Sequence, residues 1–231
     1  MARRVGRRGF FASLRALGLA SRSMTRVVVK VSLALFVCVV ATASPASARP
    51  RRALAGRSDG AAYVLPARAR GVAARRWSFV VVHHSGTAGG SARAFEAYHR
   101  GVRRMARGMA YHFVIGNGRG LGDGEVEAGR RWSLQLPGAH VASALRDGNT
   151  GVPLDDVAVG ICLVGNNEVA PPTPRQVRAL HALVRSLRRA HRIAAERVVG
   201  HNEVPGTHTA CPGRHTDMPS LRVAPLRANA T

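Results

Sequence analysis

Two apolar segments limit the folds open to this chain more than any other feature of its sequence. FVVV at 79–82 and VAVGICLVG at 157–165 contain no charged or strongly polar side chain. Successive residues of a strand point to opposite faces, so strands of this kind must be covered on both faces of a sheet. Interleaved helices supply that cover in α/β domains. We therefore predict an α/β fold, a single domain with a central mixed β-sheet flanked by helices.

Shorter patterns predict the other elements of this domain. A helix is expected from Ser91 to Arg107, with Ser91 as its N-cap. The best helical pattern runs from Pro174 to His191, directly after PPTP, with apolar residues on one face and arginines largely on the other. Three further strands are predicted, at 111–115, 125–128 and 197–200.

The first 48 residues follow the order of a secretory signal peptide. Basic residues without an acidic one precede an apolar run at 31–43, and Ala46-Ser47-Ala48 has the small-x-small form of a cleavage site. The alternative is a membrane anchor, but this run falls short of the roughly 20 apolar residues that span a bilayer. We expect export to the periplasm or the cell exterior and no stable membrane anchor. A start at Met24 and a twin-arginine signal at Arg7-Arg8 both stay open.

Length and composition set the domain count. A chain of 231 residues with 46% apolar residues can form one domain of ordinary size with extensions, but not two comfortable ones. Residues 49–76 are rich in Arg, Ala and Gly without a sustained apolar period, which predicts a basic linker or N-terminal extension. We place the domain at 77–220 and a C-terminal tail at 221–231, and we expect a monomer.

The charge of the chain favours a polyanionic partner. Lys and Arg number 35 against 12 Asp and Glu, a net charge of +23. Removal of residues 1–48 takes away eight of the basic residues and leaves 27 − 12 = +15. Nucleic acid, anionic lipid and an acidic cell wall all fit such a charge. A nucleic-acid binder is disfavoured, because only 5% of the residues are aromatic and export would remove the protein from cytoplasmic DNA.

Three residues have the chemistry of a catalytic zinc site. His83 ends one predicted strand, His201 follows another, and Cys211 lies ten residues later in a loop rich in Pro and Gly. A catalytic zinc usually takes three protein ligands and keeps a fourth position for water. The spacing is suggestive only, and a disulfide between Cys162 and Cys211 is the competing interpretation. His83 and His84 point to opposite faces of a strand, so they cannot both face one cavity.

Six motifs in order resemble those of a known family. They span about residues 77–219 and occur in the order seen in zinc-dependent N-acetylmuramoyl-L-alanine amidases and the related peptidoglycan recognition proteins. The motifs are VVVHHSGT, AYHFVIGNG, EVEAGRRW, GAHVAS, VGICLVGN and GHNEV with TACPG. The resemblance implies the fold of that family and hydrolysis of the amide between N-acetylmuramic acid and L-alanine of the peptidoglycan stem peptide.

The resemblance also implies roles for individual residues. His83, His201 and Cys211 would bind Zn²⁺, the implied cofactor. Tyr111 of AYHF would lie beside the metal as a catalytic residue, with Thr209 in support.

Substrate binding is expected from three more side chains. They are His140 of GAH, Asn149 and His84. The implied partner is peptidoglycan, and nucleic acid is not expected as one.

Two positions depart from relatives of this kind. Thr209 stands where phage-type amidases have a lysine, and Cys162 stands where another branch has a glutamate. The residue that acts as general base is therefore not identified by the resemblance. The alternative function is a peptidoglycan-binding module without turnover, although Cys211 favours an enzyme, because non-catalytic recognition proteins typically lack that cysteine.

Overall fold

A computed structural model describes residues 63–142 and 145–223. Contacts divide the chain into Met1–Ala48 and Arg49–Thr231, and the described residues belong to the second unit. The predicted signal peptide and residues 49–62 of the predicted linker lie outside them. Within the described ranges, no helix is both long and apolar enough to cross a membrane.

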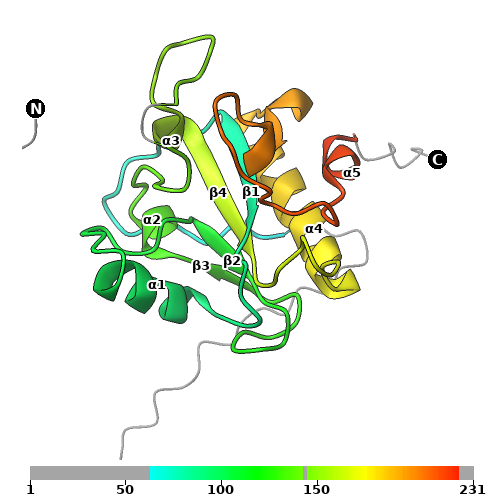
Figure 1. The fold of residues 1–231 in the computed structure, drawn as a ribbon. Helices are drawn as coiled ribbons and strands as arrows, with labels where there is room; N and C mark the ends of the chain where they lie inside the picture. The colour runs from blue at the N-terminus through cyan, green and yellow to red at the C-terminus, as the bar shows by residue number, and fades with distance from the viewer. Residues whose placement is uncertain (1–62, 143–144, 224–231) are drawn as a thin grey trace, which may run out of the picture. The chain divides into compact units, whose positions relative to one another are not determined.

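One mixed sheet of five strands forms the centre of the described domain (Figure 1). Its order is β3-β2-β4-β1-β5. Strand β1 pairs in parallel with β4 and β5, β2 pairs in parallel with β4, and β3 is antiparallel to β2. This topology confirms the predicted fold class. The strands are β1 (Phe79–His84), β2 (Phe113–Ile115), β3 (Val126–Ala128), β4 (Ala158–Leu163) and β5 (Val198–Gly200).

The two most apolar segments are the strands at the centre of the sheet. All six residues of β4 are buried, and so are the four inner residues of β1. Their burial follows from cover on both faces, as fully apolar strands require.

Helices cover the two faces of this sheet. On one face, Leu183 and Leu187 of α4 (Pro174–His191) belong to the cluster that contains Val80. On the other face, Phe95 of α1 (Ala92–Gly101) packs with Cys162 of β4. Figure 1 shows these two helices on opposite sides of the strands. The short elements are α2 (Arg130–Ser133), α3 (Leu154–Val157), η1 (Ala195–Arg197), η2 (His201–Glu203) and α5 (Met218–Arg222).

The ends of the two long helices follow from local chemistry. Helix α4 has the predicted bounds, because Thr173 and Gln176 form a capping box around Pro174 at its first turn. Helix α1 begins after Ser91, whose side chain accepts a hydrogen bond from the Ala94 amide, but it ends at Gly101 and not at Arg107. Beyond it the chain passes through Arg104 at φ 55°, a left-handed conformation that no helix continues.

The packed domain extends beyond the boundaries expected from the sequence. Tyr63 and Leu65 pack against the main core, and the Trp132 indole donates to the carbonyl of Pro66. The described part of the expected linker is therefore attached to the domain. At the other end, Leu221 of α5 is buried in the same core, so the domain continues past residue 220.

Candidate metal centre

Two parallel strands carry histidines to one edge of the sheet. Strand β1 ends with His83 and His84, and β5 leads directly into His201. Val82 is in register with Gly200, so His83 and His201 follow neighbouring positions on adjacent strands. The carboxyl ends of parallel strands meet at the same edge, and ligand sites of α/β sheets lie there. The centroids of the His83 and His201 rings are 4.6 Å apart.

The loop after His201 returns Cys211 to this edge. The Asn202 amide donates to the Cys211 carbonyl at 2.7 Å, which closes the loop at its base. The Cys211 sulfur accepts a hydrogen bond from the His84 amide at 3.3 Å and lies 3.6 Å from Nδ1 of His83. Ligand atoms of His83, His201 and Cys211 all lie within 4.8 Å of one another. His83 is buried, whereas His201 and Cys211 are partly exposed.

This donor set fits zinc. Two imidazole nitrogens and one thiol sulfur are the ligand types that zinc prefers, and three such ligands are the usual number at a catalytic centre. Cys162 and Cys211 are both free thiols, so the competing disulfide is not formed.

Burial sets the protonation of the three ligands. It lowers the pKa of His83 well below the usual value, an effect that His140 and His201 increase. Burial also lowers the pKa of His201, with Asp155 opposing the shift. Both imidazoles are therefore neutral at neutral pH and can each offer a lone pair. Burial raises the pKa of the Cys211 thiol to about 11, although the His84 amide opposes this shift.

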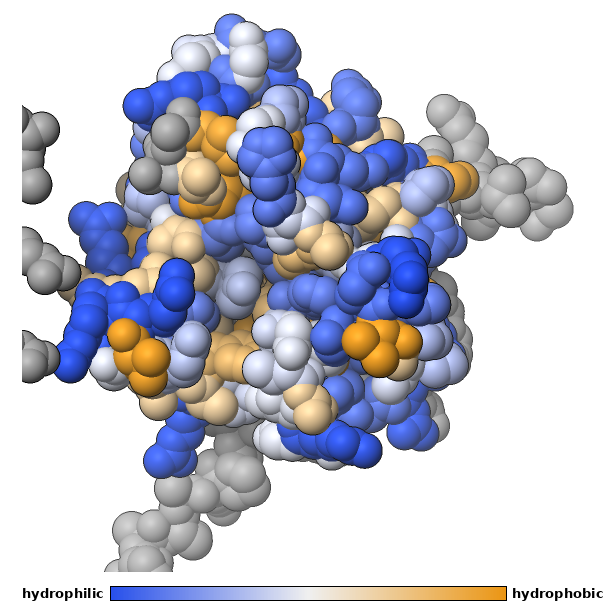
Figure 2. Space-filling view, in the orientation of Figure 1, coloured by the Kyte–Doolittle hydropathy of each residue, from blue (hydrophilic) through white to orange (hydrophobic). Residues whose placement is uncertain are grey.

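A pocket of about 540 Å³ opens close to His83. Tyr111 and His140 belong both to its wall and to the surroundings of His83, with ring centroids 5.1 Å and 4.9 Å from that of His83. Figure 2 shows this side of the molecule as mostly hydrophilic, with paler and more hydrophobic residues in a hollow near its centre. The pocket is lined by His99, Val102, Arg103, Met105, Ala110, Tyr111, Ala139 and His140.

Tyr111 carries a neutral phenol into this pocket. Burial raises its pKa well above 10, and the nearby thiols of Cys162 and Cys211 raise it further. At neutral pH the hydroxyl therefore keeps its proton and can donate a hydrogen bond.

The structure places the other expected site residues differently. Thr209 is exposed, and its hydroxyl accepts from the Cys211 amide at 3.1 Å. His84 points away from His83, and its Nδ1 accepts from the Asn167 amide at 2.9 Å. Asn149 lies in an exposed turn, where its amide donates to Asp147. His140 lines the pocket, yet its side chain is fully buried.

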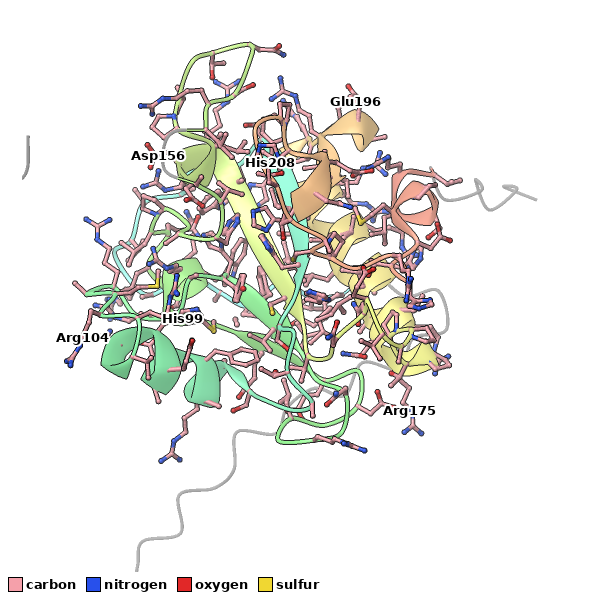
Figure 3. The ribbon with its side chains drawn as sticks, viewed as in Figure 1. His99, Arg104, Asp156, Arg175, Glu196 and His208 are labelled. Atoms are coloured by element: carbon pink, nitrogen blue, oxygen red, sulfur yellow. The ribbon has the colours of Figure 1, made fainter. Side chains whose placement is uncertain are left out.

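Residues at the end of α1 were missed as pocket residues by the sequence reasoning. His99 lines the pocket with Arg103, and its ring centroid is 5.9 Å from that of Tyr111. Figure 3 shows His99 on the side of α1 toward the sheet. Its position four residues after the buried Phe95 was the available signal, because residues i and i+4 share a helix face.

Comparisons with known proteins agree with this fold. The family model described as N-acetylmuramoyl-L-alanine amidase matches residues 73–214, more than half of the chain. The chain therefore belongs to the N-acetylmuramoyl-L-alanine amidase family. Its function accordingly concerns peptidoglycan, by cleavage or by recognition. A search of curated proteins found no match.

Solved structures similar to this fold come from several sources. The endolysin amidase LysCS from Clostridium intestinale aligns with a TM-score of 0.52 and 24% identity, over 64% of this chain and 82% of that one. The amidase LysC from the same organism has a TM-score of 0.52 and 23% identity, over 70% of this chain and 93% of that one. A mutant of Drosophila PGRP-LB, in complex with tracheal cytotoxin, has a TM-score of 0.47 and 23% identity, over 66% of this chain and 83% of that one.

Proposed function

We propose that this protein is an exported, monomeric, zinc-dependent N-acetylmuramoyl-L-alanine amidase. Its reaction adds water to the amide between the lactyl group of N-acetylmuramic acid and L-alanine. The carbon–nitrogen bond breaks, the lactyl group becomes a carboxylate, and the stem peptide leaves with a free amino terminus. The observation that carries the proposal is the convergence of His83, His201 and Cys211 beside a pocket, in a chain of this family.

The three ligands would hold the zinc that such a reaction needs. When bound, zinc lowers the pKa of a coordinated water to about 7 and polarises a carbonyl oxygen. Partial exposure of His201 and Cys211 leaves this edge of the site accessible to substrate. Cys211 is kept in place by the closed loop and by the His84 amide.

Tyr111 and Thr209 support the chemistry in different ways. The neutral Tyr111 phenol donates a hydrogen bond to the oxygen on which negative charge develops, and preorganised donors of this kind lower the barrier. The Thr209 hydroxyl accepts from the Cys211 amide and thereby fixes the loop that presents the sulfur.

The pocket beside the metal is the proposed site of the stem peptide. Arg103 lies in its wall and would pair with a peptide carboxylate through bidentate hydrogen bonds. Asn149 and His84 are proposed as secondary substrate contacts, and His84 would first have to release the Asn167 amide from its Nδ1. Peptidoglycan of the bacterial cell wall is therefore the proposed partner of this pocket.

Release of L-alanine amino termini from purified peptidoglycan tests this proposal. The zinc-loaded protein should release them, and removal of zinc with a chelator should stop the release until zinc is restored. Cys211→Ser should lose bound zinc and activity together, whereas His208→Ala, an exposed position in the same loop, should keep both. Full turnover by Cys211→Ser would show that the ligand assignment is wrong. Tight zinc binding without release would select the binding module.

A further inference from the structure

We propose that His140 is a positioning residue that fixes the ring of the zinc ligand His83, rather than a substrate contact. The inference rests on the proposed zinc function. Nδ1 of His140 lies 3.1 Å from Nε2 of His83, and the two rings meet edge to face at a centroid distance of 4.9 Å. The His140 side chain has no exposed surface. Buried polar atoms nearly always have a hydrogen-bond partner, so one of these two nitrogens donates to the other.

Only one arrangement of protons satisfies this pair when His83 binds a metal. Nδ1 of His83 faces the Cys211 sulfur, so it is the nitrogen that is available to a metal. Nε2 of the neutral ring then carries the proton and donates it to Nδ1 of His140. His140 must therefore be neutral with its own proton on Nε2. Metal-binding histidines commonly donate their second N–H to such a partner, which fixes both the tautomer and the ring orientation.

Acceptors for the proton on His140 lie on its far side. Its Nε2 is 3.4 Å from the Ala158 carbonyl and 3.6 Å from a carboxylate oxygen of Asp155. The same Asp155 oxygen accepts from the amides of His140 and Val141, at 3.1 Å and 3.4 Å. The chain of donors therefore runs from His83 through His140 to α3 and the start of β4, and every member can be neutral except the carboxylate.

Glycine at two positions makes room for the His140 ring. A Cβ at Gly160 would lie 2.3 Å from Cδ2 of His140, and one at Gly138 would lie 2.6 Å from the same atom. Both distances are shorter than any real contact, so a side chain at either position would displace the ring. The ring is thus held against the backbone of β4, and it cannot turn its nitrogens toward the pocket without losing both partners.

Zinc affinity of three variants tests the positioning role. His140→Leu removes the acceptor for the His83 proton and should weaken zinc binding about 10–100-fold, the usual effect of losing such a partner. His140→Asn places a carbonyl oxygen near the position of Nδ1 and should recover most of that loss. His181→Leu is the control. That histidine of α4 is partly buried and hydrogen-bonds to Ser220, and α4 covers the other face of the sheet.

The readouts are competition with a chromophoric chelator and the thiolate-to-cobalt charge-transfer band of the cobalt-loaded protein. The band should change in His140→Leu and return in His140→Asn. Unfolding midpoints of the metal-free variants separate loss of fold from loss of affinity. Equal zinc affinity in wild type and folded His140→Leu would overturn the inference, and so would failure of His140→Asn to recover. Zinc-bound wild type that releases no stem peptide would instead refute only the proposed enzyme. Absence of zinc binding in the wild type would overturn both the positioning role of His140 and the proposed zinc enzyme.

Discussion

At the scale of single residues, a variant of Tyr111 would separate the proposed catalysis from metal binding. Its phenol keeps its proton because burial raises its pKa well above 10, so it can donate a hydrogen bond. Tyr111→Phe removes the donor and keeps the ring. We expect kcat to fall about 10²–10³-fold, the usual loss of one oxyanion donor. Zinc content should stay that of the wild type. Steady-state kinetics with metal analysis measure both, and an unchanged kcat would remove Tyr111 from the mechanism.

The ligand pKa values predict how zinc affinity depends on pH. The Cys211 thiol, with a pKa of about 11, is protonated at neutral pH and must lose its proton to bind. His83 and His201 have lowered pKa values and are already neutral, so they lose none. Affinity should therefore rise about tenfold for each pH unit up to about pH 7, and more steeply above it, where a zinc-bound water with a pKa of about 7 also ionises.

Calorimetry in buffers with different ionisation heats counts the protons released. We expect about one proton for each zinc bound near pH 6.5, released by Cys211, and close to two near pH 8, where a zinc-bound water also ionises. Zero protons near pH 6.5 would mean that the thiol is not a ligand or is already ionised. Two protons near pH 6.5 would mean that a second protonated group, such as Cys162, also binds.

At the scale of elements, Gln176 joins α4 to the centre of the sheet. Its side-chain amide donates to the carbonyls of Ile115 and Val164, just at the ends of β2 and β4, and the residue is 1% exposed. Gln176→Leu takes the side-chain donor away from the Val164 carbonyl, while the Ile115 carbonyl keeps its bond from the Val164 amide. It also removes the half of the capping box in which the Gln176 side chain accepts from the Thr173 amide. We expect the free energy of unfolding to fall by about 1–3 kcal/mol.

Urea unfolding of the metal-free protein measures this loss. Arg189→Ala is the control, because it lies exposed on the same helix and should change stability by no more than about 0.5 kcal/mol. A loss in Gln176→Leu no larger than that of the control would show that these hydrogen bonds do not hold the helix on the sheet.

Elements with strong local signals could be predicted from the sequence, and others could not. Helix α4 has a capping box, a proline at its start and a long amphipathic period, and both ends were placed correctly. The central strands were found because they are apolar on both faces. Helices α2 and α3 have four residues each, too few to show a period. Strand β2 is shorter than expected, since it begins at Phe113 and not at Tyr111.

The site was predictable only in part, for physical reasons. His83, His201 and Cys211 could be grouped from strand-end positions and from the family resemblance, and the structure brings them together. The surroundings of His140 could not be inferred, because they depend on Gly160 of β4, which leaves space for the ring and lies twenty residues further along the chain. The local sequence around residue 140 contains no pattern that predicts a contact with a residue so far along the chain.

At the scale of the whole molecule, the fold brings distant segments together at one candidate metal centre. His83 and Cys211 are 128 residues apart in the chain, yet their ligand atoms lie 3.6 Å apart. A metal that binds only the folded arrangement stabilises it by mass action, so the site and the fold should support each other. The proposed exported form, residues 49–231, would carry 27 − 12 = +15, which agrees with an anionic wall as the surrounding in which such a site would work.

X-ray absorption at the zinc edge of the loaded protein tests the central claim most directly. We predict one zinc for each chain, with one sulfur at about 2.3 Å and two imidazole nitrogens and one further light atom at about 2.0–2.1 Å. Cys211→Ser should abolish the sulfur shell, and Cys162→Ser should leave it unchanged. A wild-type spectrum without sulfur, or with two sulfurs, would contradict the assignment of His83, His201 and Cys211 as the metal centre.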